Sequence, residues 1–462
     1  MNNLQESLKD LYNNSSENVI GVSLGFKYVN NEKTDTIAVV YFVKNKLPID
    51  QIQPPEEPIP SSLNIDGITY TTDVIETDEP VAVSCYSSSD TNVTRLQTEL
   101  EVDGVSLKGG QEIIRFPNGF SANGSSYTVS TLGMMCVDNI DNKFVGIGCA
   151  HAILDKFDLA RDSNLLTQES QPYNIYDTNN LFNSNSYRPS VVCWDKVSNV
   201  STVPNKNIGT HIKRYSPLRG GTTNPQFSIN SISEWNQVDA AVIGIKSIYL
   251  NIDSHKIYTP VGTNEYAEIM DFATTSELDN LLISNPLIYS TGRTTGPKGY
   301  STLCRMSITN ISQYIVISIN GIYYPFNNVI AFRYNNTSYS SPVQAGDSGS
   351  AVIGEFSGGV RKILGIVFAK STTIGYFCRI DDIVNRLNIR KWDWTESIDG
   401  TVLNSRLVEG TPSLLKVVVD SDTSPTSNYN TLKGQDRIVV GGKTYYQAGF
   451  TKNNYPLYSY TG

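Results

Sequence analysis

The sequence lacks the features that define several large protein classes. No apolar run in its 462 residues approaches the ~20 residues that a membrane-spanning helix needs, so we expect no membrane partner. It has no block of like charges, and a formal charge of −9 with a pI near 5.0 disfavours nucleic acid as a partner. The N-terminus shows no basic stretch followed by an apolar core. We see no secretory signal and expect a cytoplasmic or virion-associated protein.

Metal-binding and disulfide patterns are also missing. The six cysteines are widely scattered without a CxxC pair, and none of the three histidines lies beside a cysteine pair. In a chain without a visible export signal, we interpret the cysteines as mostly reduced, buried apolar side chains. We therefore expect no metal site and no disulfide framework. The cysteines are Cys85, Cys136, Cys149, Cys193, Cys304 and Cys378, and the histidines are His151, His211 and His255.

What the chain does contain favours strands and turns. Tyrosine occurs 27 times, while 34 glycines and 20 prolines are near average usage, so the chain is neither collagen-like nor broadly disordered. Its length suggests about two to four domains. From about residue 126 to residue 395, short apolar strands alternate with turn signals. That pattern is typical of an all-β barrel or sandwich.

Changes in this pattern divide the chain into segments. Residues 1–82 predict a small α+β domain, with an amphipathic helix, a hairpin of two β-rich runs, a proline-rich stretch and a further strand. Residues 83–125 predict a connector rich in Ser, Thr and Gly. Residues 126–245 and 246–395 predict two β-rich units, the second of which ends in a helix. Residues 396–462 predict a small β module with a hairpin at VVGGKTYY.

The sharpest local pattern is QAGDSGSAVI at residues 344–353. A serine between glycines, in a turn that leads into an apolar strand, exposes its hydroxyl, and Gly346 keeps the turn free of a side chain. The backbone N–H groups of Gly346 and Ser348 can then converge on one point. Acyl transfer needs a nucleophilic oxygen beside two such donors. We predict Ser348 as a nucleophile, with Gly346 and Ser348 forming an oxyanion hole; the competing interpretation is an ordinary glycine-rich turn.

A serine nucleophile needs a base, and His151 is the best placed of the three histidines. It follows the apolar strand of KFVGIGCAHAIL, whereas His211 and His255 lie in polar, turn-like surroundings. The base needs a carboxylate to orient it. Asp239 directly precedes the apolar run AAVIGI, while Asp195 has no such run after it. The predicted triad, in chain order, is His151, Asp239 and Ser348.

These stretches resemble the trypsin-like serine peptidases, and more closely their bacterial and plant branch that includes the NARROW LEAF 1-like proteins. GIGCAHAIL is similar to the family's histidine segment, VDAAVIGI to its aspartate strand and QAGDSGSAVI to its nucleophile loop. STGRTTGPKGYST resembles a turn of that branch, and LGIVFAKSTTIGYFCRIDDIV its last strands and helix. NVIGVSLGFKYVN, TDTIAVVYFVKNKLP and DGITYTTDVIE resemble its small N-terminal domain.

The resemblance implies a mainly β, chymotrypsin-like fold. Two six-stranded antiparallel β-barrels would occupy residues 126–245 and 246–395, with the active site in the cleft between them. An extended substrate would then pair with the edge of one strand of the second barrel. That edge would consist of Val367, Phe368 and Ala369.

The resemblance also bears on specificity and on the support of the aspartate. Pro342 lies six residues before Ser348, where trypsins carry the acid that selects Arg or Lys, so we expect a small or apolar P1 residue. The strand residue that would donate a hydroxyl to Asp239 is Ile366 or Val367. Asp239 is therefore expected to lack hydroxyl partners.

Together these patterns predict a serine endopeptidase with non-tryptic specificity. It would hydrolyse polypeptides through an acyl-enzyme intermediate and would need no cofactor. The alternative is a structural or binding protein, such as a phage or virion component, that retains the fold and forms an oligomer or a larger assembly through its C-terminal module. An esterase would use the same triad.

Overall fold

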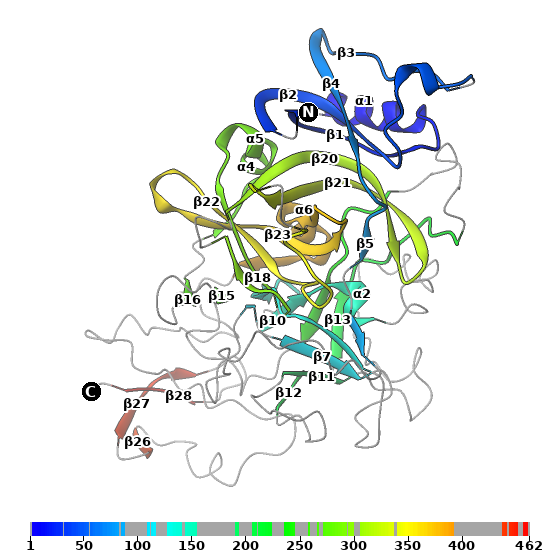
Figure 1. Ribbon diagram of the computed structural model, residues 1–462. Coiled ribbons are helices and arrows are strands. Elements are labelled where there is room, and N and C mark those ends of the chain that lie inside the picture. Colours follow the sequence, from blue (N-terminus) through cyan, green and yellow to red (C-terminus); the bar gives the residue numbers. More distant parts are fainter. Residues whose placement is uncertain are drawn as a thin grey trace.

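The structure, a computed structural model, is built mainly from antiparallel β-sheet (Figure 1). Within the part of the chain that it describes, no helix has the length and apolar character needed to cross a membrane. The described residues are 2–30, 32–54, 56–82, 85–87, 109–110, 112–116, 127–140, 144–154, 190–193, 206–209, 211–223, 235–244, 257–258, 266–267, 271–292, 294–299, 305–336, 340–391, 437–440, 443–450 and 456–460.

The second half of the central region forms a closed antiparallel barrel. Its strands pair in the order β18–β22–β23–β24–β21–β20, and Ile288 of β18 pairs with Met306 of β20 to close the ring. Aromatic side chains fill the interior, with the rings of Phe326 and Phe368 4.9 Å apart. The strands are β18 (Leu287–Gly292), β20 (Met306–Ile319), β21 (Ile322–Tyr334), β22 (Ala351–Glu355), β23 (Arg361–Lys370) and β24 (Gly375–Arg379).

The first barrel is closed by two bent strands. β8 continues into β9 through Leu132 and Gly133, and β12 is followed after one residue by β13. The ring runs β7–β8/β9–β10–β14–β13/β12–β11 and returns to β7. Because each bent strand pairs in two sheets, the sheets join into one barrel. Its strands are β7 (Glu112–Phe116), β8 (Tyr127–Thr131), β9 (Met134–Asp138), β10 (Phe144–Gly148), β11 (Ser190–Cys193), β12 (Lys206–Gly209), β13 (His211–Tyr215) and β14 (Ala241–Gly244).

The N-terminal residues extend the sheet of the second barrel. β1 pairs with β20 along Gly21–Gly25, so the order continues β20–β1–β2–β4–β3. The amphipathic helix α1 packs on this sheet and buries Leu8 completely. In its described residues, the proline-rich stretch after β2 contains no strand, because proline cannot donate a hydrogen bond to a sheet. It contains a short 3₁₀ helix (Ile49–Gln51). The elements are α1 (Asn2–Asn13), β1 (Val19–Val29), β2 (Glu32–Val43), β3 (Ser62–Ile65) and β4 (Ile68–Glu76).

Short elements complete the described fold. β5 leads from the N-terminal sheet towards the first barrel, where β6 pairs with β8 (Figure 1). Three antiparallel strands near the C-terminus form a separate sheet. The remaining elements are β5 (Val81–Ala82), β6 (Cys85–Ser87), α2 (Ala150–Ile153), β15 (Ile257–Tyr258), β16 (Tyr266–Ala267), β17 (Asp271–Phe272), α4 (Thr275–Asp279), α5 (Leu281–Ser284), β19 (Gly296–Lys298), a 3₁₀ helix (Ser357–Gly359), α6 (Ile380–Leu387), β25 (Ile389–Lys391), β26 (Arg437–Val440), β27 (Lys443–Phe450) and β28 (Pro456–Tyr460).

The predicted double antiparallel barrel is confirmed, together with the first helix, its following hairpin and the helix at the end of the second barrel. The expectation of a connector over residues 83–125 needs correction. β6 and β7 lie inside it, and both pair with β8 in the sheet of the first barrel. β6 pairs with a strand far along the chain, and a polar stretch separates β7 from β8, so the local composition of residues 83–125 did not indicate β6 or β7.

The buried side chain of Arg379, at the end of β24, attaches helix α6 to the second barrel. Arg379 forms ion pairs of 2.7 Å with Asp279 and 2.8 Å with Asp381, and it also donates to Asn328. Asp382 accepts a hydrogen bond of 2.8 Å from the amide of the same asparagine. Burial, and then the charge of Asp381, raise the pKa of Asp382 to about 6. The folded protein therefore holds a proton on Asp382 more tightly than the unfolded chain does.

We expect Asp382→Asn to stabilise the protein at pH 7–8 but not near pH 4. Ionisation of Asp382 costs stability as the pH rises through about 6, and the amide removes that cost, on the order of 1 kcal/mol. Thermal unfolding at both pH values measures the effect. Asp381→Asn, which removes the ion pair with Arg379, should instead destabilise the protein at pH 7. An Asp382→Asn effect independent of pH contradicts this assignment.

Candidate active site

The three predicted triad residues meet where the two barrels face each other. His151 lies in the short helix α2 directly after β10, and Asp239 lies just before β14, so both come from the first barrel. Ser348 lies in the loop that leads into β22 of the second barrel. All three residues have 0% exposure. The structure thus brings together side chains that are up to 197 positions apart in the sequence.

Asp239 fixes both the position and the tautomer of His151. One carboxylate oxygen accepts the backbone N–H of His151 at 3.0 Å, and the other lies 2.5 Å from ring atom Nδ1. With Nδ1 donating to the carboxylate, Nε2 is left as the acceptor. Nε2 lies 3.0 Å from Oγ of Ser348. The hydroxyl can therefore donate its proton towards the imidazole, the arrangement needed to activate an oxygen nucleophile.

The loop that carries Ser348 is fixed from both barrels. From the first barrel, Thr131 donates its backbone N–H to the Ser348 carbonyl at 2.8 Å and its hydroxyl to the Gly346 carbonyl at 3.0 Å. From the second barrel, Val367 accepts the N–H of Gly349 at 2.9 Å. Gly346 and Gly349 have φ angles of +97° and +93°, which favour glycine. The serine is therefore presented on a tight turn with little freedom to move.

The same turn leaves two backbone donors beside the serine. Among the described residues, no acceptor takes a hydrogen bond from the N–H of Gly346 or of Ser348. Between them, the buried Asp347 side chain accepts the N–H groups of Thr294 and Thr295 at 2.9 and 3.1 Å and the Thr295 hydroxyl at 2.7 Å. This carboxylate turns away from the serine and ties the loop to the chain after β18. Two N–H groups thus remain for an oxyanion.

Two buried thiols pack around the backbone of Asp239. The sulfur of Cys149 lies 3.3 Å from the Asp239 carbonyl and 3.4 Å from that of Val367, and the Asp239 N–H donates to the sulfur of Cys378 at 3.3 Å. Burial, and then the charge of Asp239, raise the pKa of both thiols well above their usual range. Both thiols are therefore protonated, and they link the aspartate to the second barrel.

Side-chain ligand atoms of Cys149, His151 and Asp239 lie within 4.8 Å of one another, so we tested this cluster as a metal site. A metal ligand must be a thiolate, a free imidazole nitrogen or a free carboxylate oxygen. Here Nδ1 of His151 and both carboxylate oxygens of Asp239 are already engaged in hydrogen bonds between these two residues. The donor set does not fit a metal.

The residues expected to bind substrate are all largely buried. Pro342 lies in the loop before Ser348, with its side chain buried, and Val367 and Ala369 lie in β23 with exposures of 1% and 0%. Phe368 points into the barrel and packs on Phe326. Any contact of these strand residues with a substrate would have to use their backbone.

Among the described residues, both hydrogen bonds to the Asp239 carboxylate come from His151, and Ile366 is buried and apolar. Within the described part of the chain, no hydroxyl forms a hydrogen bond with this carboxylate. Of the other candidates, His211 lies in β13, where its side chain is outside the described residues. His255 and Asp195 lie outside them altogether.

Sequence reasoning missed Thr131, Cys149 and the roles of Thr294 and Thr295. The sequence around Thr131 does not distinguish it from other strand threonines, because its role is a hydrogen bond to Gly346, 215 positions away. The sequence does carry a weak signal for the two threonines, since they lie in STGRTTGPKGYST, the stretch that resembles a turn of the peptidase branch, but the sequence does not show which acceptor their N–H groups bind.

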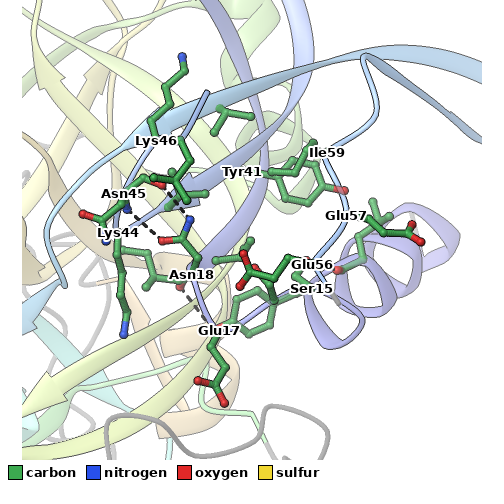
Figure 2. Close-up of a pocket in the computed structure, with 18 of the residues that line it drawn as sticks. Ser15, Glu17, Asn18, Tyr41, Lys44, Asn45, Lys46, Glu56, Glu57 and Ile59 are labelled. Atoms are coloured by element: carbon green, nitrogen blue, oxygen red, sulfur yellow. Dashed lines mark hydrogen bonds between the residues drawn. The ribbon is translucent and has the colours of Figure 1, made fainter. Parts of the chain in front are cut away.

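A groove lies away from these residues, in the N-terminal region (Figure 2). It has a volume of about 1040 Å³ and lies between α1, the N-terminal sheet and the proline-rich stretch. Figure 2 shows Asn18 and Asn45 joined by two hydrogen bonds at its wall, of 2.8 and 3.0 Å. No residue of the predicted catalytic or substrate site lines it.

We expect Gly349→Ala to destabilise the protein strongly. A Cβ atom there would lie 2.1 Å from the Thr131 carbonyl oxygen, and the φ of +93° is unfavourable for alanine. The matched control is Gly358→Ala, where φ is +82° but no atom lies within 4 Å of the added carbon. The control should lose about 1–2 kcal/mol from backbone strain alone, and Gly349→Ala clearly more. If thermal unfolding shows the same loss of stability in Gly349→Ala and Gly358→Ala, the close approach of Gly349 to Thr131 does not contribute to stability.

Comparisons with known proteins leave the family open. No family model matches the chain, and no curated protein matches it. Among solved structures, it is similar to a Nocardiopsis protease (12% identity, covering 62% of this chain and 98% of that chain, TM-score 0.32). It is equally similar in TM-score (0.32) to Thermobifida fusca protease A (9% identity, 62% and 97% covered) and a Cellulomonas bogoriensis chymotrypsin (9%, 62% and 98%). A TM-score this low supports no inference, so the double barrel rests on the strand pairing, and the likeness to NARROW LEAF 1-like proteins stays a prediction.

Proposed function

We propose that this protein is a serine endopeptidase that cleaves polypeptides through an acyl-enzyme. One observation carries the proposal: His151 connects Asp239 to the hydroxyl of Ser348, at 2.5 and 3.0 Å, beside two backbone N–H groups without a described acceptor. A buried His–Asp pair alone has many structural explanations. A hydroxyl on the remaining imidazole nitrogen, in a turn that two glycines hold open, is the arrangement for nucleophilic attack.

The proposed reaction begins with attack on a peptide carbonyl. Oγ of Ser348 forms a bond to the carbonyl carbon while its proton passes to Nε2 of His151. The N–H groups of Gly346 and Ser348 then donate to the oxyanion. When the C–N bond breaks, His151 gives its proton to the leaving amine, and an acyl group remains on Ser348. Water, deprotonated by His151, attacks this ester, and the proton returns to Ser348 as the acid leaves.

Asp239 acts in this proposal by stabilising charge. As His151 takes up a proton, the imidazolium faces the carboxylate that already accepts Nδ1–H, so the positive charge forms next to a fixed negative one. The second carboxylate oxygen holds the backbone of the same histidine at 3.0 Å. Because the carboxylate of Asp239 accepts both the backbone N–H and Nδ1–H of His151, we expect the imidazole to keep its orientation without a hydroxyl bound to the carboxylate.

A substrate would pair with the edge of β23 near Val367 and Ala369, using backbone hydrogen bonds. Such a mode requires an extended polypeptide, and it sets few demands on side chains. Pro342 before the serine loop brings no charge to the P1 position. We therefore propose a small or apolar P1 residue in place of a basic one.

A second candidate is a binding or structural protein that retains this fold. The observation in its favour is that His151 and Ser348 both have 0% exposure, so the site is closed to solvent. A substrate must be able to reach a catalytic serine. In a protein that has lost catalytic activity, the serine can stay buried. Covalent labelling separates the two candidates because it asks only whether the hydroxyl reacts.

We expect a fluorophosphonate probe to modify Ser348 and no other serine, because its hydroxyl lies 3.0 Å from Nε2 of His151, a contact that no other serine makes among the described residues. Peptide mapping after prolonged incubation locates the adduct. Ser348→Ala and His151→Ala should abolish labelling without unfolding the protein. Ser307→Ala, in β20, should label like the wild type. An unlabelled, folded wild type would contradict the proposed nucleophile.

We expect Asp239→Asn to slow labelling of Ser348 by on the order of 10⁴-fold, because the amide cannot stabilise the Nδ1–H tautomer or the imidazolium. The measurement is the second-order rate constant for the probe, with the unfolding midpoint as a check on the fold. A rate within about threefold of the wild type would show that the carboxylate is not part of the reacting group.

A further inference from the structure

One segment of the chain runs from the N-terminal sheet across the two barrels, and we call its described residues, 77–82 and 85–87, the crossing segment (Figure 1). Its first residues are attached to the turn after β23. The Thr77 hydroxyl donates to that of Ser371 at 3.2 Å, and Asp78 accepts the N–H of Thr372 at 2.9 and 3.1 Å. These contacts place the segment at the end of β23.

The next residues pair with the free edge of β23. β22 begins at Ala351, opposite Ile366, so β23 extends past it towards Lys370. On this extension β5 pairs in antiparallel fashion, with Val81 opposite Lys370 and Ala82 opposite Ala369. The chain therefore advances along β23 towards Val367, whose carbonyl accepts the N–H of Gly349 next to the serine. It points at Ser348 in its N-to-C direction.

Beyond the serine, the chain is fixed again on the first barrel. Cys85 of β6 pairs with Val129 of β8, two residues before Thr131, which holds the carbonyls of Ser348 and Gly346. Ala82 and Cys85 are separated by three peptide units, which span at most about 11 Å. The two described ends of the crossing segment thus pair with β23 and β8, the two strands that hold the loop carrying Ser348.

We propose that the crossing segment occupies the substrate groove of this chain's own site, in substrate direction, and excludes other polypeptides. This rests on the proposed function, since it takes the β23 edge as the substrate strand. It accounts for the complete burial of His151 and Ser348 in a site that otherwise has every group for catalysis. It also identifies the ligand chemistry of the groove: an extended chain that pairs with β23 through its backbone, since the side chain of Val81 is exposed.

Covalent attachment gives this segment an advantage over any free substrate. A tethered ligand acts at an effective concentration on the order of millimolar, which few free polypeptides reach. Among the described contacts, its docking on β23 uses two residue pairs and the side chains of Thr77 and Asp78, with one further pair between Val81 and β20. Weakening these contacts should open the groove while both barrels stay folded.

The test compares wild type, Val81→Pro and Val81→Ala. Val81 pairs with β20 on one side and β23 on the other. Proline removes its N–H and disrupts the ladder, whereas alanine loses the same side chain and keeps the backbone. The readouts are the rate of fluorophosphonate labelling at Ser348 and hydrogen exchange over residues 366–371. Asp78→Ala is a second way to loosen the segment, with the exposed Asp50→Ala as its control.

Val81→Pro and Asp78→Ala should label at least about tenfold faster than wild type, the change expected when one or two docking hydrogen bonds are lost. Exchange at 366–371 should rise in both, and the two controls should behave like wild type. A synthetic peptide of residues 76–84 should slow labelling of the opened variants. A single cut within the segment that disappears in Ser348→Ala would support groove occupancy as well.

Equal labelling rates in all five proteins would overturn the inference and leave the proposed nucleophile intact. If no protein labels while exchange rises in Val81→Pro and Asp78→Ala, the segment does dock on β23 but the proposed serine chemistry fails, and inhibition fails with it. Unchanged exchange in both loosened variants would overturn the docking itself.

Discussion

The buried carboxylate of Asp239 is the constraint around which the site is built. A carboxylate without exposure to water is costly unless hydrogen bonds compensate for its lost hydration. Among the described residues, the compensation comes from His151, through its backbone and its ring. Because Nδ1 of His151 donates to Asp239, Nε2 carries no proton and can accept a hydrogen bond from the hydroxyl of Ser348. Burial therefore imposes orientation, and the thiols of Cys149 and Cys378 hold the aspartate backbone that makes this possible.

Local patterns were enough to find the three central residues. QAGDSGSAVI marks a glycine-flanked serine before a buried strand, and VDAAVIGI marks an acid at the start of another, so both signals lie within ten residues. Short apolar strands separated by turn signals likewise indicated the β-rich region from about residue 126 to residue 395, but not β7 of the first barrel, which lies before it. These features depend on burial and turn geometry, which neighbouring residues encode directly.

The contacts that hold the site together could not be predicted in the same way. Thr131 is an unremarkable strand threonine until its hydroxyl is seen on Gly346, 215 positions later. β5 consists of two residues, too few for any periodicity, and its partners Ala369 and Ser318 lie more than 200 positions away. β1 joins the sheet of the second barrel through β20, although its own sequence suggested only a local hairpin. Such pairings depend on the whole topology, and composition does not encode them.

The pairing of β1 with β20 also limits what can move when the groove opens. Because the N-terminal sheet continues the sheet of the second barrel, opening by displacement of that whole region would break many ladder hydrogen bonds. In the crossing segment, β5 pairs with β23 at two residues and with β20 at one, while β6 pairs with β8 at three. Release of β5 from β23 alone would leave the pairing of β1 with β20 and of β6 with β8 in place. In the proposed inhibition, the closed and the open site would then share the same two barrels and differ in the position of a few residues.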